Sequence, residues 1–147
     1  MRILRTLFSL LIVGFMMSGC NSGKSWRGGF AIHTWFAAKR TGESNYTVYD
    51  VVGWRGYNGQ PVMRITEDIP DRYWFGEKPR LIKEHRGVEV DELIDAVEKA
   101  ADVYPWKTTY KAFPGPNSNT FTAFIAKHVP ELELDLPFSA IGCGYVK

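Results

Sequence analysis

The sequence has few cysteines and lacks the short motifs of nucleotide, metal and common hydrolase chemistry. Only two of its 147 residues are cysteines, too few for a disulfide framework. It contains no Gly-rich phosphate loop ending in Lys-Ser or Lys-Thr, no G-x-S-x-G elbow and no H-E-x-x-H helix. Its three histidines are far apart in the sequence. These absences argue against nucleotide-binding proteins, α/β-hydrolases and zinc enzymes, and the sequence predicts no metal and no cofactor.

The chain also lacks a strong excess of one charge. It has 18 basic and 16 acidic residues, and two of the basic ones, Arg2 and Arg5, precede an apolar run over 7–17. Loss of that segment would leave the two charge types equal in number. A nucleic-acid-binding protein needs a concentrated basic face, so we expect no nucleic acid partner. With 45% hydrophobic and 14% aromatic residues, the chain can build the core of one domain.

The apolar run is about eleven residues long, too short for a comfortable transmembrane helix. It ends in Met17-Ser18-Gly19-Cys20, and a basic start, an apolar middle and small residues at the end are typical of a secretory leader. The tetrapeptide resembles a bacterial lipobox, which implies lipid attachment to the Cys20 thiol and cleavage before it. A plain signal peptide and an anchor helix are the alternatives.

The domain boundaries follow from this leader. We predict a lipoprotein signal peptide over 1–19, a flexible tether over 20–29 and a single α+β domain over 30–147. The lipid makes the membrane a partner and implies the bacterial cell envelope. Asn21 after the cysteine favours the periplasmic face of the outer membrane in a cell with two membranes, as in lipoproteins generally.

The apolar pattern predicts a small antiparallel sheet and two main helices. The expected strands are 30–38 and 46–54, joined as a hairpin, followed by 62–66 and 108–113. The segment 80–86 is compatible with a strand or a helical turn. A helix is expected over 89–104, where one apolar stripe ends at a proline. Alternating leucines over 132–136 indicate an edge strand or an extended arm.

The segment 113–128 combines a stiff turn with an amphipathic helix. Pro114, Gly115 and Pro116 do not fit inside a regular element, whereas apolar residues then recur at helical spacing. Asn117 is a favoured N-cap type, and Ser118 follows in the first turn, where free backbone N–H groups and the positive end of the helix dipole meet. Ser118 is therefore either an ordinary helix-start residue or a nucleophile beside an anion site.

The order of three residues resembles a known fold. His33 lies on the first expected strand, Asp50 on the next, and Ser118 at the start of a late helix. This order is similar to the circularly permuted branch of the NlpC-type papain-like fold, which includes lecithin retinol acyltransferase. The resemblance implies that Ser118 is the nucleophile, His33 the base and Asp50 the residue that orients the imidazole. It also implies backbone N–H groups near Ser118 as oxyanion donors.

A closer resemblance is to a bacterial family known only as a domain of unknown function. It is carried by His-Thr-Trp at 33–35, Val-Val-Gly-Trp at 51–54, Tyr-Trp-Phe-Gly at 73–76, the segment 114–121 and Leu-Asp-Leu-Pro at 134–137. This likeness names no activity.

The sequence departs from the papain-like pattern at the nucleophile. The pattern has a cysteine where this chain has Ser118, and a serine hydroxyl is a weaker nucleophile that must lose its proton to a base during attack. Other roles stay open: Ser118 as part of a helix cap, His33 as a core histidine bound to a backbone carbonyl, and Asp50 as the partner of Arg55 or Arg64.

Two functions are compatible with these residues. The first is a serine-variant hydrolase or acyltransferase that acts on an amide or ester in the envelope, such as a peptide crosslink or a lipid. The second is a non-catalytic lipoprotein that binds a peptide, glycan or lipid in the same cleft. The expected binding residues are Asn117, Asn119, Tyr73, Trp74 and Phe75.

Overall fold

The computed structural model describes residues 9–16 and 32–146. Over these residues the chain is an α+β domain with one five-stranded sheet in the order β4-β3-β2-β1-β5, in which all neighbours are antiparallel. The strands are β1 (Ser9–Met16), β2 (Ile32–Lys39), β3 (Tyr46–Val51), β4 (Met63–Asp68) and β5 (Arg80–Arg86). The α+β class and the hairpin of β2 with β3 are confirmed, and the ambiguous segment 80–86 is a strand.

β1 falls within the predicted leader. It pairs with β2 on one side and with β5 on the other. Whether the leader is removed is a matter of processing, so the predicted signal peptide stays a prediction. Cys20 and the predicted tether lie outside the described residues.

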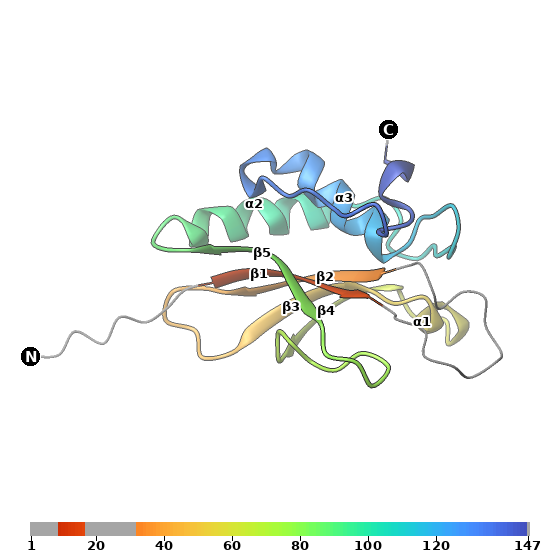
Figure 1. The fold of residues 1–147 in the computed structure, drawn as a ribbon, viewed down its shortest axis with the longest axis horizontal. Coiled ribbons are helices and arrows are strands. Elements are labelled where there is room, and N and C mark those ends of the chain that lie inside the picture. The colour runs from red at the N-terminus through yellow and green to blue at the C-terminus, as the bar shows by residue number, and fades with distance from the viewer. Residues whose placement is uncertain (1–8, 17–31, 147) are drawn as a thin grey trace, which may run out of the picture.

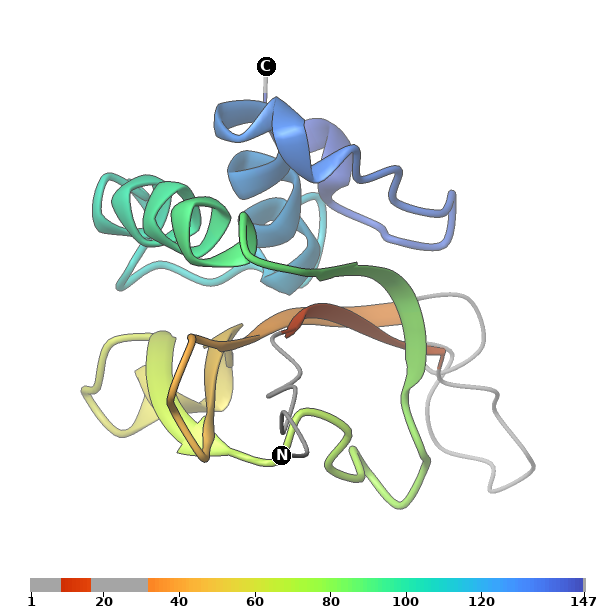
Figure 2. The same ribbon diagram turned by 90° about the vertical axis from the view of Figure 1, so that its left-hand side faces the viewer.

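Two helices, α2 (Val90–Asp102) and α3 (Ser118–His128), cover one face of the sheet (Figures 1 and 2). Alternate residues of β2 and β3 face these helices, because side chains along a strand point to opposite faces in turn. Phe36 and Tyr49 pack there with Ile94 of α2 and Phe121 of α3, and all four are buried. This layer is the main core.

The opposite face of the sheet carries a smaller core. Trp35, Ala37 and Val48 pack there with Trp74. Trp74 belongs to the connection between β4 and β5, which runs beneath the sheet on the side away from α2 and α3 (Figures 1 and 2). The domain therefore has helices on one face and the loop that carries Trp74 on the other.

Two expected elements differ from the structure, and a third takes one of its two predicted forms. The strand predicted over 46–54 ends at Val51, and the four-residue helix α1 (Trp54–Tyr57) follows. The strand predicted over 108–113 is irregular, because the backbone N–H of Lys111 donates to the carbonyl of Pro116 instead of to a strand. The segment 132–136 is an extended arm, with Leu132 buried and acidic residues exposed between the leucines.

Short 3-10 turns complete the chain, η1 (Pro130–Leu132) and η2 (Cys143–Tyr145). Among the helices that the structure describes, none is long and apolar enough to cross a membrane.

Candidate active site

The start of α3 is held by a reciprocal cap. Asn117 Oδ1 accepts a hydrogen bond from the backbone N–H of Thr120 at 3.1 Å, and Thr120 Oγ1 accepts one from the backbone N–H of Asn117 at 3.1 Å. This pattern satisfies two donors that a helix start otherwise leaves open. The prediction of Asn117 as N-cap is confirmed.

The amide groups of Asn117 and Asn119 are engaged inside the protein. Asn117 Nδ2 donates to the carbonyls of Ala112 and Ile141, each at 3.0 Å. Asn119 Nδ2 donates to the carbonyls of Ile32 and Ile141 at 2.8 and 2.9 Å. The two side chains join the start of β2, the start of α3 and the C-terminal segment, so in this structure they position the site.

Ser118 is the first residue of α3 and is 3% exposed. Its carbonyl accepts a hydrogen bond from Thr122 Oγ1. Within the described part of the chain, the Ser118 hydroxyl and the backbone N–H groups of Ser118 and Asn119 make no hydrogen bond. Unpaired N–H groups at a helix start, together with the helix dipole, favour a negative charge in front of them.

His33 is held by contacts on its edge and on its ring face. Its Nε2 lies 2.9 Å from Asp50 Oδ1, and its ring stacks on Trp74 with centroids 4.2 Å apart and planes 5° apart. An ionised carboxylate can only accept hydrogen bonds, so Nε2 carries the proton. In the neutral ring, Nδ1 is then the basic nitrogen.

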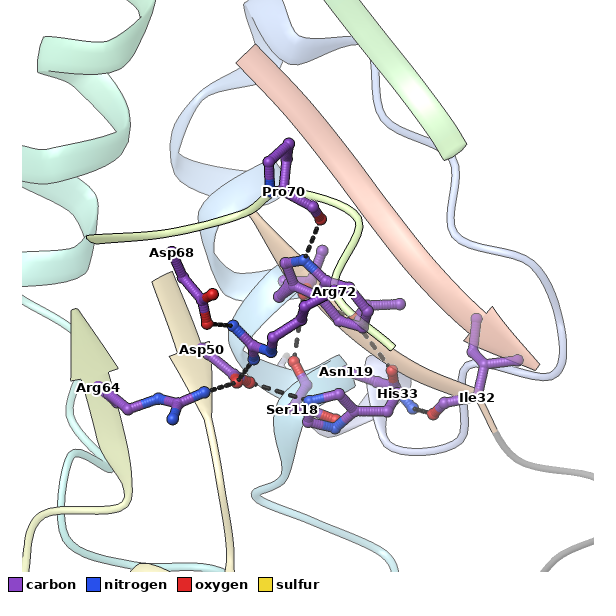
Figure 3. Close-up of polar contacts among 12 residues, drawn as sticks. Ile32, His33, Asp50, Arg64, Asp68, Pro70, Arg72, Ser118 and Asn119 are labelled. Atoms are coloured by element: carbon purple, nitrogen blue, oxygen red, sulfur yellow. Dashed lines mark hydrogen bonds and ion pairs between the residues drawn. The ribbon is translucent and has the colours of Figure 1, made fainter. Parts of the chain in front are cut away.

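Asp50 is fully buried and is bound by two arginines as well as by His33 (Figure 3). Its Oδ2 accepts hydrogen bonds from Nη2 of Arg64 at 2.9 Å and from Nη2 of Arg72 at 2.5 Å. Burial alone would raise the pKa of Asp50, but His33, Arg72 and Arg64 outweigh it and lower the pKa to about 2. Asp50 is thus a permanent carboxylate near neutral pH.

A cavity of about 330 Å³ lies beside His33 and the start of α3. His33, Ser118 and the two asparagines line it together with a wall of aromatic side chains, namely Trp54, Tyr57, Trp74, Phe75 and Tyr110. Among the described residues, no Asp, Glu, Lys or Arg lines it. Asp50 stands behind His33 rather than in the wall. Tyr73 is outside the lining and 67% exposed.

Ser118 and His33 approach the cavity from different faces of the sheet. β2 and β3 pair only from Phe36–Tyr49 to Ala38–Thr47, and no further pair forms towards Ile32 and Val51 along the described strands. Ser118 and His33 both line the cavity at this end, where β2 and β3 do not pair with each other (Figure 3). No hydrogen bond joins Ser118 Oγ to either ring nitrogen of His33 in the described structure.

Sequence reasoning missed part of the site. Of the two arginines weighed as partners of Asp50, Arg64 binds it, whereas Arg55 Nε donates to the carbonyl of Pro61. Arg72 was not foreseen, since it lies in a loop 22 residues from Asp50. Tyr110 was not foreseen either, because it was assigned to a strand.

Cys143 near the C-terminus is a free, partly buried thiol. In the parts of the chain that the structure describes, no group of three His, Cys, Asp or Glu side chains could hold a metal ion.

The comparisons with known proteins place the chain in one family. Residues 20–145 match a family model described as "Protein of unknown function (DUF3750)". No curated protein and no solved structure matches the chain. Because the match covers most of the sequence, the chain belongs to the DUF3750 family.

Proposed function

We propose that this DUF3750 protein is a lipid-anchored envelope protein whose cavity transfers or hydrolyses an acyl group through Ser118. One observation carries the proposal. The ring of His33 is fixed by Asp50 and by Trp74, with its basic nitrogen left over, in the cavity that also holds Ser118 and two unpaired N–H groups. These are the parts that nucleophilic acyl transfer requires.

The reaction assigns one role to each part. Ser118 Oγ attacks the carbonyl carbon of an ester or amide while its proton passes to His33 Nδ1. The N–H groups of Ser118 and Asn119 face the oxyanion that forms. Collapse breaks the bond to the leaving group, which takes the proton from His33. Water or an acceptor hydroxyl then attacks the acyl-serine, with His33 again taking and returning a proton.

Substrate binding has to bring Ser118 Oγ to His33. Hydrogen bonds of a catalytic site are often long or unaligned without substrate. A rotation of the serine side chain about its Cα–Cβ bond changes the direction of Oγ without moving α3. The ends of β2 and β3 that do not pair with each other leave space between them for the two groups.

The same arrangement supports a permuted papain-like fold as part of the proposal. The chain order of base, acid and helix-start nucleophile is the order of that fold. The acid binds one ring nitrogen, and the other is left for the nucleophile. Among the base, the acid and the nucleophile, the one departure from that pattern is Ser118 in place of the cysteine.

The cavity wall favours an uncharged group as the part of the substrate that enters. Apart from His33 and the Ser118 hydroxyl, the described side chains that line it are apolar, aromatic or amide. An ammonium group brought there would lose its hydration without gaining an ion pair from the described lining. An ester or amide with apolar neighbours fits better than a charged peptide.

A fluorophosphonate probe tests the chemistry, because it phosphonylates an activated serine. We expect labelling of the full chain at Ser118, its loss in Ser118→Ala and a reduction of about 100-fold in rate in His33→Gln. Ser44→Ala, in an exposed loop, is the matched control and should label like the wild type. Absence of labelling, or labelling that does not depend on His33, would contradict the proposal.

One observation favours the second function, a binding lipoprotein. The Ser118 hydroxyl makes no hydrogen bond to His33, while Trp54 is 47% exposed and stacks on Trp74 with centroids 5.2 Å apart. Such a wall binds ligands by stacking and apolar contact. If the cavity only binds, Trp54→Ala should weaken the affinity for its ligand, whereas Ser118→Ala should leave that affinity unchanged. The ligands to titrate are phosphatidylcholine micelles, soluble glycan fragments and peptides.

The lipid anchor has an independent test. Mass spectrometry of the protein purified from membranes should show a chain that begins at Cys20 and carries acyl groups. Several acyl chains hold a protein firmly at a membrane, whereas one binds marginally. Cys20→Ala should abolish both the cleavage and the lipid, and an unmodified wild-type chain would contradict the anchor.

A further inference from the structure

The loop between β4 and β5 carries two of the aromatic side chains in the cavity wall. Trp74 and Phe75 lie in this loop, where Trp74 and Glu77 exchange backbone hydrogen bonds of 3.0 and 3.1 Å around a tight turn. Phe75 adopts a left-handed φ of 49° in the turn and is 70% exposed. The turn sets the direction of the two rings, but it does not attach the loop to the sheet.

Arg72 makes that attachment. Its Nη2 binds Asp50 on β3, and its Nη1 binds Asp68 at the end of β4 at 2.9 Å. Its guanidinium also lies over the rings of Trp35 and Trp74, 5.3 and 5.2 Å from their centroids. A planar guanidinium can donate to two carboxylates and stack on aromatic rings at once. A lysine in its place could not.

Apart from the two partners of Arg72, of which Asp68 also accepts from the N–H of Ile69, one more sheet residue among those described bonds to this loop: Trp35 Nε1 donates to the carbonyl of Pro70 at 3.1 Å. Both of these bonds precede Arg72 in sequence and do not reach the turn with Trp74. Arg72 is two residues from Trp74, so it fixes the backbone next to the residue whose ring covers His33.

We propose that Arg72 is a positioning residue that holds the Trp74–Phe75 wall against the ring of His33 while it binds the carboxylate that orients the same ring. The Arg72 guanidinium thus fixes both contacts of the His33 ring: the hydrogen bond of its edge to Asp50 and the stacking of its face on Trp74. The inference rests on the proposed function in treating the cavity as the active site. The geometry of the His33 ring can be measured without any reaction, so the two ideas fail separately.

The measurement is the NMR shift of the His33 ring protons in the full chain. In the wild type, the parallel ring of Trp74 at 4.2 Å shifts these protons upfield. We expect Arg72→Gln to lose most of this upfield shift and to increase quenching of tryptophan fluorescence by acrylamide. Arg72→Lys should not restore either signal, because it cannot bind both carboxylates and cover the rings.

Arg64→Gln is the matched control. It removes the other guanidinium from the same oxygen of Asp50, but Arg64 lies on β4 and does not carry the wall. We expect it to keep the upfield shift. An unchanged His33 shift in Arg72→Gln, or an equal loss in Arg64→Gln, would overturn the proposal.

Asp68→Asn serves if Arg72→Gln does not fold. It weakens only the outer contact of Arg72 and leaves Asp50 with all its partners. A partial loss of the His33 shift is expected, and no loss would count against Arg72 as the attachment. Activity separates the two ideas. If fluorophosphonate never labels Ser118 but the shifts behave as stated, the positioning role stands and the catalytic function fails.

Discussion

At the scale of single residues, Asp50 connects most of the polar groups around His33. Its carboxylate is fully buried and binds three side chains, one from each of β2, β4 and the following loop. A buried charge is tolerated because all its partners are in place, and the loss of one partner of such a group costs about 3 to 5 kcal/mol. The site thus depends on Asp50 both for the orientation of His33 and for folding.

Acid should weaken the protein through Asp50. Its pKa is lowered from 3.8 to about 2, so its contribution is complete above about pH 4 and is lost as the pH falls through 2. The shift corresponds to about 2 kcal/mol of unfolding free energy. Urea unfolding of the wild type should show this decrease, and Asp50→Asn, less stable at pH 6, should lack it. Asp71→Asn, in an exposed pair, should follow the wild type, and an equal decrease in Asp50→Asn would contradict the assignment.

Gly142 is required by the cap of α3. Its φ is +100°, and a Cβ on it would lie 2.4 Å from Asn117 Nδ2. Gly142→Ala should therefore lower the unfolding free energy by about 2 kcal/mol or more, through backbone strain and loss of the cap. Gly144→Ala meets no atom within 4 Å and should change it by less than about 0.5 kcal/mol. Similar values for the two variants in chemical denaturation would show that the cap does not need this glycine.

At the scale of elements, α3 is tied to the sheet by a buried polar contact. Thr34 Oγ1 on β2 donates to Asn119 Oδ1 at 2.9 Å and lies 2.7 Å from Thr122 Oγ1. All three residues are buried, so the start of α3 is placed over the start of β2 by hydrogen bonds as well as by apolar packing.

Thr34→Val removes these hydrogen bonds at nearly constant volume. It should cost about 1 to 3 kcal/mol, because the buried Asn119 Oδ1 loses its hydrogen-bond donor. It should also speed amide exchange at Thr120 and Phe121, whose N–H groups bond to Asn117. Thr66→Val, a half-buried site on β4, should be nearly neutral in both measurements. If exchange at the start of α3 is unchanged, the contact does not position the helix.

The elements that the sequence predicts well are those with local signals. α2 follows from an apolar stripe that ends at Pro105, and α3 from the Asn117 cap and helical spacing. The strand prediction for 108–113 is wrong because the conformation of this segment depends on residues distant in sequence. Tyr110, for example, packs so closely on Gly53 that a Cβ there would lie 2.6 Å from its ring. Side-chain alternation alone does not show such packing.

The site was predictable to a similar extent. The order of His33, Asp50 and Ser118 identifies three residues, and the structure places His33 and Ser118 in one cavity with Asp50 behind. Arg72 could not be found, because an arginine in a loop carries no sign of a buried partner 22 residues away. The amides of Asn117 and Asn119 looked available to a ligand, and only the structure shows their internal acceptors.

At the scale of the whole molecule, β1 belongs both to the predicted leader and to the sheet. β5 is an end strand whose only strand partner in the described sheet is β1. If the leader is removed before Cys20, β5 loses that partner.

Amide exchange of residues 80–86 should therefore be faster in the processed protein than in a full chain kept intact by Cys20→Ala, since unpaired strand amides open to water. The amides of β4, which pair with β3, provide the internal control. Equal protection of β5 in both forms would show that it finds another partner after processing.

The central claim is that His33 acts on the side chain at position 118, and Ser118→Cys tests it most directly. A thiol paired with a histidine ionises more easily and reacts faster than an isolated one. We predict that iodoacetamide alkylates the introduced thiol at pH 6 at least about 10-fold faster in Ser118→Cys than in Ser118→Cys with His33→Gln. Cys143, a free thiol, is the reference within each molecule, and mass spectrometry assigns the adducts. Equal alkylation rates at position 118 with and without His33 would contradict the account.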